Sequence, residues 1–269
     1  MSMPFGYVSP EQQMRDKADY ARKGIARGRS VVVLQYEDGI LFVAPNPSRA
    51  LHKISEIYDK IGFAAVGRYN EFEALRLGGI RYADINGYTY ARDDVTARGL
   101  ANLYAQNLGQ IFTESLKPFE VEIVVAEVGD SSDEDHIYRL TFDGSVFDEA
   151  GLVAMGGQAE AVAGRLKERY RDGLPLGEAL EAALFALTEP GGERFPANQL
   201  EVAVLDRNRP HRKFLRLNGP RLERLLADGA PAAGPATTAT KNESPLTAPE
   251  TPGAPPTAPD GDIDTGSSG

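Results

Sequence analysis

The stretch that most constrains the fold of this chain is residues 30–44, SVVVLQYEDGILFVA. Residues 31–33 are three valines, whose β-branched side chains suit a pleated strand, and residues 40–43 form a second apolar run. Asp38-Gly39 between the runs is a strong hairpin signal, because a type I′ turn needs positive φ at both central residues. Neither run alternates between apolar and polar residues, so both strands should be buried on both faces. The stretch predicts a β-hairpin at the centre of a layered protein.

The C-terminal part of the chain differs in composition from the rest. Residues 229–269 contain eight prolines, one lysine, five acidic residues and no aromatic residue. Such a segment cannot bury enough apolar surface to offset the entropy lost on ordering, so we predict a disordered, acidic tail rich in Pro, Ala and Thr. The residues before it are numerous enough for one well-buried domain, which we place at residues 9–228.

Charge and composition exclude several classes of function. The net charge is −10, and the tail supplies −4 of it. The body is therefore acidic, which argues against nucleic acid as a partner because phosphate binding needs a basic surface. The absence of cysteine excludes disulfides and thiolate chemistry. No signal-peptide pattern opens the chain and no apolar run approaches the ~18 residues of a membrane span, so we expect a cytoplasmic protein with no membrane contact.

The first predicted helix begins after Ser9. Ser9 suits the N-cap, Pro10 the first helical position, and Gln12 follows the cap by three residues. The helix carries one narrow apolar stripe, which consists of Met14, Ala18, Ala21 and Ile25. From the pattern alone, this stripe fits two roles about equally: covering the protein's own core, or packing on a neighbouring subunit.

The rest of the chain alternates runs of strands with pairs of helices. Strands are predicted at residues 61–66, 120–128, 136–142, 145–147, 152–155, 200–205 and 213–217. Helices are predicted at residues 69–86, 93 or 94 to 116, 158–170, 175–187 and 220–227, with a connection at 87–90. Strands gathered into runs with hairpin turns favour antiparallel sheets, which the paired helices would cover. We therefore predict an α+β fold, with two stacked antiparallel sheets between helix layers.

Three local features carry predictions of their own. Gly78 and Gly79 lie inside a predicted helix, where each costs about 1 kcal/mol relative to Ala, so we expect another element to approach closely there. Asp93 or Asp94 is predicted to cap the next helix. Residues 129–135 are predicted to be a solvated acidic turn, because they lack the inner glycine and ligand spacing of a calcium loop.

The sequence predicts no metal site and no cofactor. The histidines, His52, His136 and His211, lie far apart and lack metal-ligand spacing, so surface or polar-loop roles are expected. Gly156-Gly157 lacks the pattern of a phosphate loop and predicts a tight strand-to-helix turn. No G-x-S-x-G motif of a serine hydrolase is present.

Many segments in order link the chain to a known family. They are SPEQQMRDKADYARKGIARGRSVVVLQYEDGILFVAPNPSRALHKISEIYDKIGFAAVG, GRYNEFEALRLGGIRYAD, LANLYAQNLGQIFTE, VEIVVAEV, YRLTFDGS and LEVAVLDRNRP. With these segments, residues 5–226 resemble the α subunits of the actinobacterial core proteasome. The resemblance implies the four-layer αββα sandwich of N-terminal-nucleophile hydrolases, in agreement with the element order predicted above. The tail lies outside it.

The same resemblance implies that the chain has no catalytic residue. Proteasome β subunits use an N-terminal threonine as nucleophile and its own amine as base. When the hairpin here is laid on the first hairpin of a β subunit, the nucleophile falls at Arg29, beside Ser30, and the following acidic residue falls at Pro45. A predicted helix precedes Arg29 in place of a cleavable propeptide. The chain is therefore expected to keep the scaffold of the hydrolase without its chemistry.

The role implied by the resemblance is structural and regulatory. Such subunits form heptameric outer rings on the β rings, gate entry with their N-termini and receive the C-terminal tails of a ring ATPase that handles tagged, unfolded protein substrates. The gate would be residues 1–8, with Phe5, Tyr7 and Val8, and the apolar stripe would pack between ring neighbours. The lysine that binds the tail carboxylate would be Lys53, in the motif ALHKISEIYD.

Plainer alternatives remain open at each of these sites. From spacing alone, Lys53 is an ordinary solvated lysine, and only the motif favours the docking pocket. Residues 1–8 also fit an ordinary frayed terminus, although aromatic residues can plug an apolar constriction.

Two other functions compete with the subunit role. One is a self-processing hydrolase that would expose Ser30 as a new N-terminus, and the other is a homo-oligomeric scaffold unrelated to proteolysis.

Overall fold

The computed structural model describes residues 9–48 and 50–228. The predicted gate residues Phe5, Tyr7 and Val8, and the predicted tail at 229–269, lie outside the described residues.

Two antiparallel five-stranded sheets form the centre of the domain. The first sheet has the order β10 (Phe214–Leu217), β9 (Leu200–Asp206), β2 (Gly39–Pro45), β1 (Val31–Tyr36) and β8 (Leu152–Met155). The second has the order β3 (Ile54–Tyr58), β4 (Ile61–Gly67), β5 (Val121–Glu127), β6 (His136–Leu140) and β7 (Val146–Asp148). All pairings within each sheet are antiparallel, as the hairpin-rich sequence predicts.

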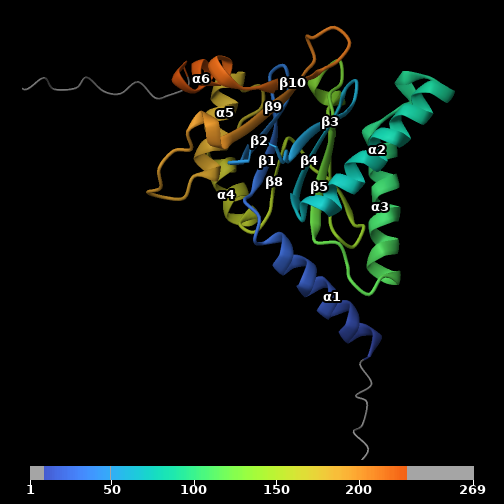
Figure 1. Cartoon of the computed structure of the whole chain (residues 1–269). Helices are drawn as coiled ribbons and strands as arrows, with labels where there is room; N and C mark the ends of the chain where they lie inside the picture. The colour runs from blue at the N-terminus through green and yellow to red at the C-terminus, as the bar shows by residue number, and fades with distance from the viewer. Residues whose placement is uncertain (1–8, 49, 229–269) are drawn as a thin grey trace, which may run out of the picture. The chain divides into compact units, whose positions relative to one another are not determined.

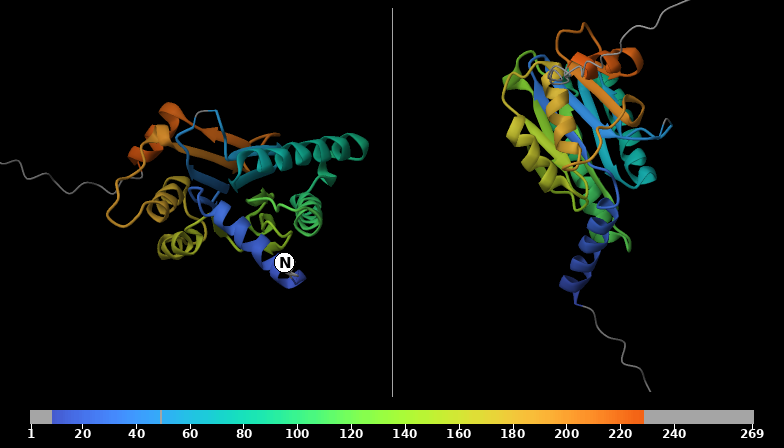
Figure 2. Two further views of the ribbon diagram at one scale, coloured as in Figure 1. Left: turned by 60° about the horizontal axis from the view of Figure 1, so that its bottom comes forward. Right: turned by 90° about the vertical axis from the view of Figure 1, so that its left-hand side faces the viewer.

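Helices cover the outer face of each sheet (Figures 1 and 2). On the first sheet lie α4 (Ala159–Arg169) and α5 (Leu176–Leu187), with α6 (Gly219–Asp228) packed beside α5. On the second lie α2 (Tyr69–Thr89) and α3 (Ala97–Glu114), and α1 (Pro10–Ile25) contacts β4 and β5. Three short 3₁₀ turns complete the described chain, at Arg92–Asp94, Ser132–Glu134 and Ala197–Gln199. The predicted four-layer αββα sandwich is confirmed.

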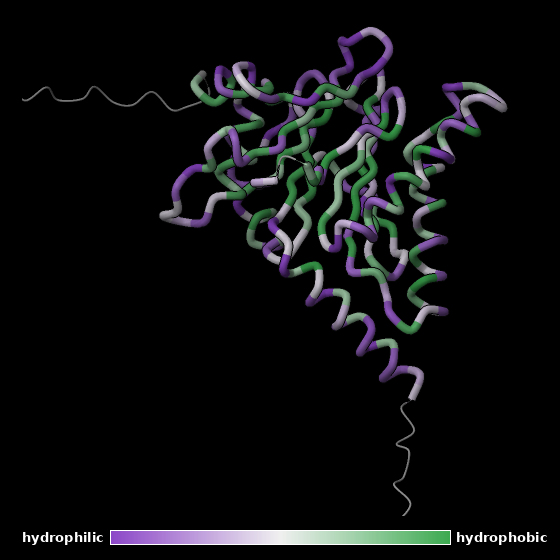
Figure 3. Tube along the Cα trace, in the orientation of Figure 1, coloured by the Kyte–Doolittle hydropathy of each residue, from purple (hydrophilic) through white to green (hydrophobic). Residues whose placement is uncertain are grey.

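Three apolar layers hold the sandwich together, and the central hairpin belongs to two of them. Val31 and Val33 face the second sheet in the inter-sheet core, whereas Val32 and Leu34 face α4 and α5. The third layer lies between the second sheet and its helices. The side chains of residues 31–34 in β1 are all fully buried, which confirms the prediction of strands buried on both faces. Figure 3 shows the hydrophobic residues gathered in the strands, while α1 is mostly hydrophilic.

The hairpin turn differs from the predicted type. Tyr36 pairs with Gly39, so the central residues are Glu37 and Asp38, and neither has positive φ. The predicted type I′ turn is therefore wrong, although the hairpin itself is confirmed. Glycine is required at 39 because its φ is +146° and an added Cβ would lie 2.0 Å from the carbonyl oxygen of Leu205 on β9.

The helices α2 and α3 correct two boundaries. α2 continues to Thr89 through the predicted connection at 87–90. The cap of α3 is Thr96, whose hydroxyl accepts a hydrogen bond from the Gly99 N–H at 3.1 Å, while Asp93 and Asp94 lie in a 3₁₀ turn. The predicted cap is therefore wrong: the 3₁₀ turn that holds both aspartates has its C-cap at Val95, and the helix begins only after Thr96.

The two glycines predicted to allow a close approach in α2 behave differently. At Gly79 an added Cβ would lie 1.8 Å from the Tyr104 hydroxyl of α3, whereas nothing lies within 4 Å at Gly78. Close packing thus explains Gly79, and nothing in the described structure explains Gly78.

The acidic turn at 129–135 is only partly solvated. Asp130, Asp133 and Glu134 are exposed, but the side chain of Asp135 is fully buried and forms an ion pair with Arg207 at 2.9 Å. The prediction fails at this residue because its partner, Arg207, directly follows β9 and lies far along the chain.

Among the described residues, no helix is both long enough and apolar enough to span a membrane.

Candidate functional site

The residues that the hairpin alignment places at the nucleophile and acid positions come together in the structure. Arg29, Ser30 and Pro45 line one pocket of about 410 Å³, whose other wall includes Glu189 and Phe195 from the segment after α5. The Ser30 nitrogen lies in a peptide bond with Arg29, so this chain offers no free amine there to act as a base. At the positions that the hairpin alignment assigns to a nucleophile and an acid, the pocket thus presents Arg29, Ser30 and Pro45, with no threonine and no free α-amine.

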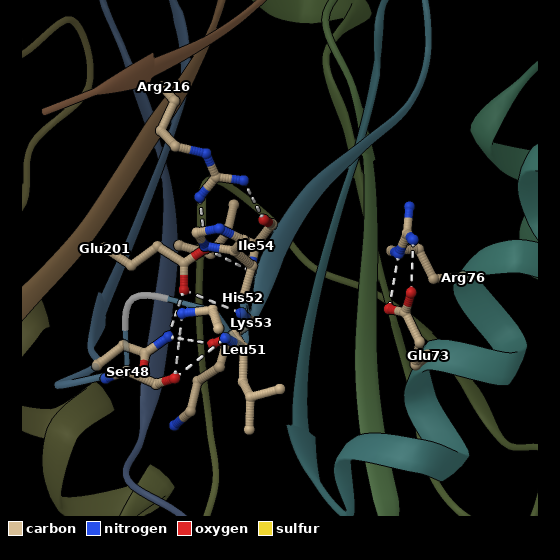
Figure 4. A network of polar contacts seen from close by, with 11 residues as sticks. Ser48, Leu51, His52, Lys53, Ile54, Glu73, Arg76, Glu201 and Arg216 are labelled. Carbon is tan, nitrogen blue, oxygen red and sulfur yellow. Dashed lines mark hydrogen bonds and ion pairs between the residues drawn. The ribbon is translucent and has the colours of Figure 1, made fainter.

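Lys53 lies beside this pocket and is held at three points. Its Nζ donates to the carbonyl oxygen of Arg29 at 2.8 Å. Its backbone N–H donates to Glu201 Oε2 at 2.9 Å, and its backbone carbonyl accepts from the Ala65 N–H at 3.0 Å. Figure 4 shows Lys53 next to the Glu201 carboxylate. The lysine thus reaches the residue at the lost nucleophile position from a fixed backbone.

The surroundings of Lys53 make its ammonium costly to charge. Burial lowers the pKa of Lys53 to about 8, the neighbouring Glu201 carboxylate opposes the drop, and the Arg29 guanidinium adds to it. An ammonium with this environment gains more than a solvated lysine from an added anion. Lys53 is thus only partly buried and is held at its backbone and at one carbonyl oxygen, and its role in docking stays a prediction.

Sequence reasoning missed Glu201, which organises the loop around Lys53. Glu201 lies in β9, whose other residues up to Leu205 are buried and apolar, and its own side chain is 5% exposed. A charged residue inside the apolar run LEVAVL was the available signal, because an isolated carboxylate is rarely buried without partners.

The apolar stripe of α1 divides between two environments. The helix begins as predicted, with the Ser9 hydroxyl accepting from the Gln12 N–H at 3.2 Å. Ala21 and Ile25 are buried in the inter-sheet core, and Ala18 packs against it. Met14, at the far end, is 37% exposed. The C-terminal half of the stripe therefore covers the domain's own core.

The remaining predicted sites are not brought together. His52 lies 3.1 Å from Glu201, His136 stacks on Tyr138, and His211 sits in a turn with φ of +61°. Within the described ranges, no group of three potential metal ligands occurs. The predicted strand-to-helix turn at Gly156-Gly157 is confirmed between β8 and α4, with Gly156 at φ +104°.

Comparison with known proteins gives one consistent family. The family model described as "Proteasome subunit" matches residues 25–205. The chain is 88% identical to "Proteasome subunit alpha" of Streptosporangium roseum over 269 residues, which covers all of both chains. It is 71% identical to the protein of that name from Thermomonospora curvata, over 86% of this chain and 100% of the relative. With the protein of that name from Thermobifida fusca it shares 66% identity, over 85% of this chain and 92% of the relative. The chain therefore belongs to the family of proteasome α subunits.

Proposed function

We propose that this α subunit is a non-catalytic wall and gate of the core proteasome, and that Lys53 docks the C-terminal tails of an activating ring ATPase. The subunits form heptameric outer rings on rings of catalytic β subunits in the cytoplasm. The ATPase delivers unfolded substrates tagged with a prokaryotic ubiquitin-like protein. The observation that carries the proposal is the partly buried Lys53 ammonium on the Arg29 carbonyl, where a hydrolase would hold its nucleophile.

The absence of catalysis follows from the residues at the pocket. Arg29 cannot act as a nucleophile at neutral pH because its guanidinium stays protonated. Ser30 lacks an adjacent base in the form of a free amine, and Pro45 cannot orient one. These substitutions favour the subunit role over the self-processing hydrolase.

The docking role follows from the donors that Lys53 has left. An ammonium has three N–H donors, and the Arg29 carbonyl occupies one of them. A tail carboxylate can take the others in a charge-assisted contact worth about 1.5–3 kcal/mol. Because the site is partly desolvated, the contact is screened less than a surface ion pair would be.

Ring packing is proposed for the N-terminal half of the α1 stripe. Met14 is exposed together with Tyr20, which is 47% exposed, whereas Ala21 and Ile25 are already used by the domain's own core. We therefore assign contact with the neighbouring subunit to Met14 and the outer side of Ala18. The assignment of a gate to residues 1–8 rests on the family alone.

Deletion of residues 1–8 tests the gate. In the assembled particle with β subunits, the deletion should raise the rate of small-peptide hydrolysis about tenfold or more, because a closed constriction limits entry. The measurement is fluorogenic peptide hydrolysis by the purified particle, compared with a particle whose tail at 229–269 is removed. An unchanged rate in the first particle, at equal particle concentration, would count against the gate.

A further inference from the structure

A buried carboxylate in β9 accepts hydrogen bonds from several groups of one loop. Glu201 pairs with Ala44 of β2, and its side chain is almost completely enclosed. Burying a carboxylate is strongly unfavourable unless hydrogen bonds and charges surround it. The groups that do so here are the Asn46 side-chain amide, the His52 ring, the backbone N–H groups of Lys53 and Ile54, and the Arg216 guanidinium.

All of these donors except Arg216 come from residues 46–54, which connect the two sheets. Asn46 Nδ2 lies 2.8 Å from Glu201 Oε2 and also donates to the Leu51 carbonyl at 2.7 Å, so it closes the loop on itself. The Ile54 N–H donates to Oε1 at 3.2 Å. Arg216 on β10 bridges the same carboxylate and the Ile54 carbonyl, the latter at 2.7 Å. Figure 4 shows His52, Lys53, Ile54 and Arg216 around the Glu201 carboxylate.

Lys53 lies near the end of this loop, so contacts that hold the loop in place also hold the backbone of Lys53 in place. Glu201 holds the backbone nitrogen of Lys53, and the side chain then spans the distance to the Arg29 carbonyl. The charged groups around the ammonium are the Glu201 carboxylate from β9 and the Arg29 guanidinium from the segment before β1. The His52 ring and the Arg216 guanidinium contact Oε1 of this carboxylate, whereas the Lys53 N–H contacts Oε2. Of these, Glu201 supplies the negative charge that favours a protonated lysine.

We propose that Glu201 is the positioning residue of the Lys53 site: it holds the loop at 46–54 so that the ammonium is presented, charged, beside Arg29. The proposal rests on the proposed function, in which Lys53 receives a tail carboxylate. A carboxylate is needed because each of its oxygens accepts at least two hydrogen bonds. A glutamine would turn an NH₂ group toward one set of these donors.

The test uses the assembled particle and a synthetic peptide with the C-terminal residues of the ring ATPase. The same peptide with an amidated C-terminus is the blank. Glu201→Gln should weaken binding of the free-acid peptide about tenfold, the effect of losing one charge-assisted contact. As the pH rises, binding to this variant should also be lost at a lower pH than binding to the wild type. The reason is that the negative charge that raises the pKa of Lys53 is gone. Glu201→Asp keeps the charge but is one methylene shorter, so it should weaken binding while the pH profile stays near that of the wild type.

Glu127→Gln is the matched control. Glu127 is a buried carboxylate of β5 that accepts the Ala97 N–H at 2.7 Å and pairs with Lys60 at 2.9 Å, and none of these contacts involves the Lys53 loop. This variant should lower stability and leave peptide binding unchanged. If Glu201 contributes only to stability, its variants should behave like Glu127→Gln. They would then be less stable, but each particle that assembles would bind the peptide with the affinity and pH profile of the wild type.

The outcomes separate this inference from the proposed function. Wild-type binding and pH profile in Glu201→Gln, together with weak binding in Lys53→Ala, would overturn the positioning role and leave docking in place. Wild-type binding in Lys53→Ala would overturn docking itself. In that case the role of Glu201 is tested without any peptide. Mass spectrometry follows the acetylation of Lys53 by acetic anhydride as a function of pH, and a lower Lys53 pKa in Glu201→Gln than in the wild type would support the positioning role, whereas an equal pKa would overturn it. If Glu201→Gln does not assemble, unchanged binding in Glu201→Asp overturns the proposal and weakened binding supports it.

Discussion

Replacement of Lys53 by Ala should weaken docking of the ATPase tail by about tenfold to a hundredfold, the equivalent of a charge-assisted hydrogen bond of about 1.5–3 kcal/mol. The loss is large because the lysine is held by Glu201 and Arg29, so little side-chain entropy opposes the contact. Ring assembly should be unaffected, since Lys53 is not among the hydrophobic residues that form the three apolar layers of the described chain. The measurement is titration of the assembled particle with the tail peptide.

The pH dependence of docking distinguishes this contact from general electrostatics. Docking needs the charged ammonium, and the pKa of Lys53 in the free site is about 8. Wild-type affinity should therefore be level below pH 8 and fall as the pH rises beyond it, because proton uptake then accompanies binding. Lys53→Ala should show no such fall.

Lys167→Ala is the matched control for the lost charge. Lys167 is an exposed lysine of α4, so its removal changes the net charge equally without touching the Lys53 loop. If both variants weakened docking equally, the loss would come from the change in net charge, and Lys53 would have no specific role.

Replacement of Arg207 by Ala should lower the free energy of unfolding by about 3–5 kcal/mol, because it leaves a buried carboxylate without its partner. The side chain of Asp135 is fully buried and lies 2.9 Å from the guanidinium of Arg207, whose side chain is 11% exposed. Arg207 also donates to the Gly129 carbonyl at 2.9 Å, and Gln35 of β1 donates to the same carboxylate at 3.2 Å. The cluster joins the two sheets at the hairpin end, so its loss should be felt by the whole domain.

Chemical denaturation of the purified chain measures this effect. Arg171→Ala is the control, because its ion pair with Glu178 is more than half exposed on both sides and should contribute less than about 1 kcal/mol. Adding Asp135→Asn to Arg207→Ala should recover part of the loss, since the uncompensated charge is removed. Equal costs for Arg171→Ala and Arg207→Ala would show that the buried pair does not bind the sheets together.

The layers of the fold could be predicted from local sequence, and the polar contacts between them could not. Unbroken apolar runs such as residues 31–33 indicate strands buried on both faces, and Ser9-Pro10 marks a helix start through contacts three residues apart. Asp135 and Arg207 are 72 positions apart, and Glu201 lies 148 positions from Lys53. No local pattern pairs such residues, because the register of two separate sheets brings them together.

Turn and cap geometry failed for a different reason. Asp38-Gly39 is the favoured type I′ pair, yet the ladder to β9 fixes Gly39 inside the strand by the approach of the Leu205 carbonyl. Tertiary contact thus overrides the local preference. At the Lys53 site, the sequence could indicate the lysine only through a family resemblance, since its spacing is that of any surface lysine.

The central claim is that this chain keeps a hydrolase scaffold whose reactive terminus has been replaced by a continuous chain through Arg29 and Ser30. Intact-mass analysis of the α chain purified without β subunits, before and after treatment with an acylating β-lactone, tests it most directly. We expect no species that begins at Ser30 and no acyl adduct at Ser30. A species that starts at Ser30 and carries the acyl group would contradict the claim.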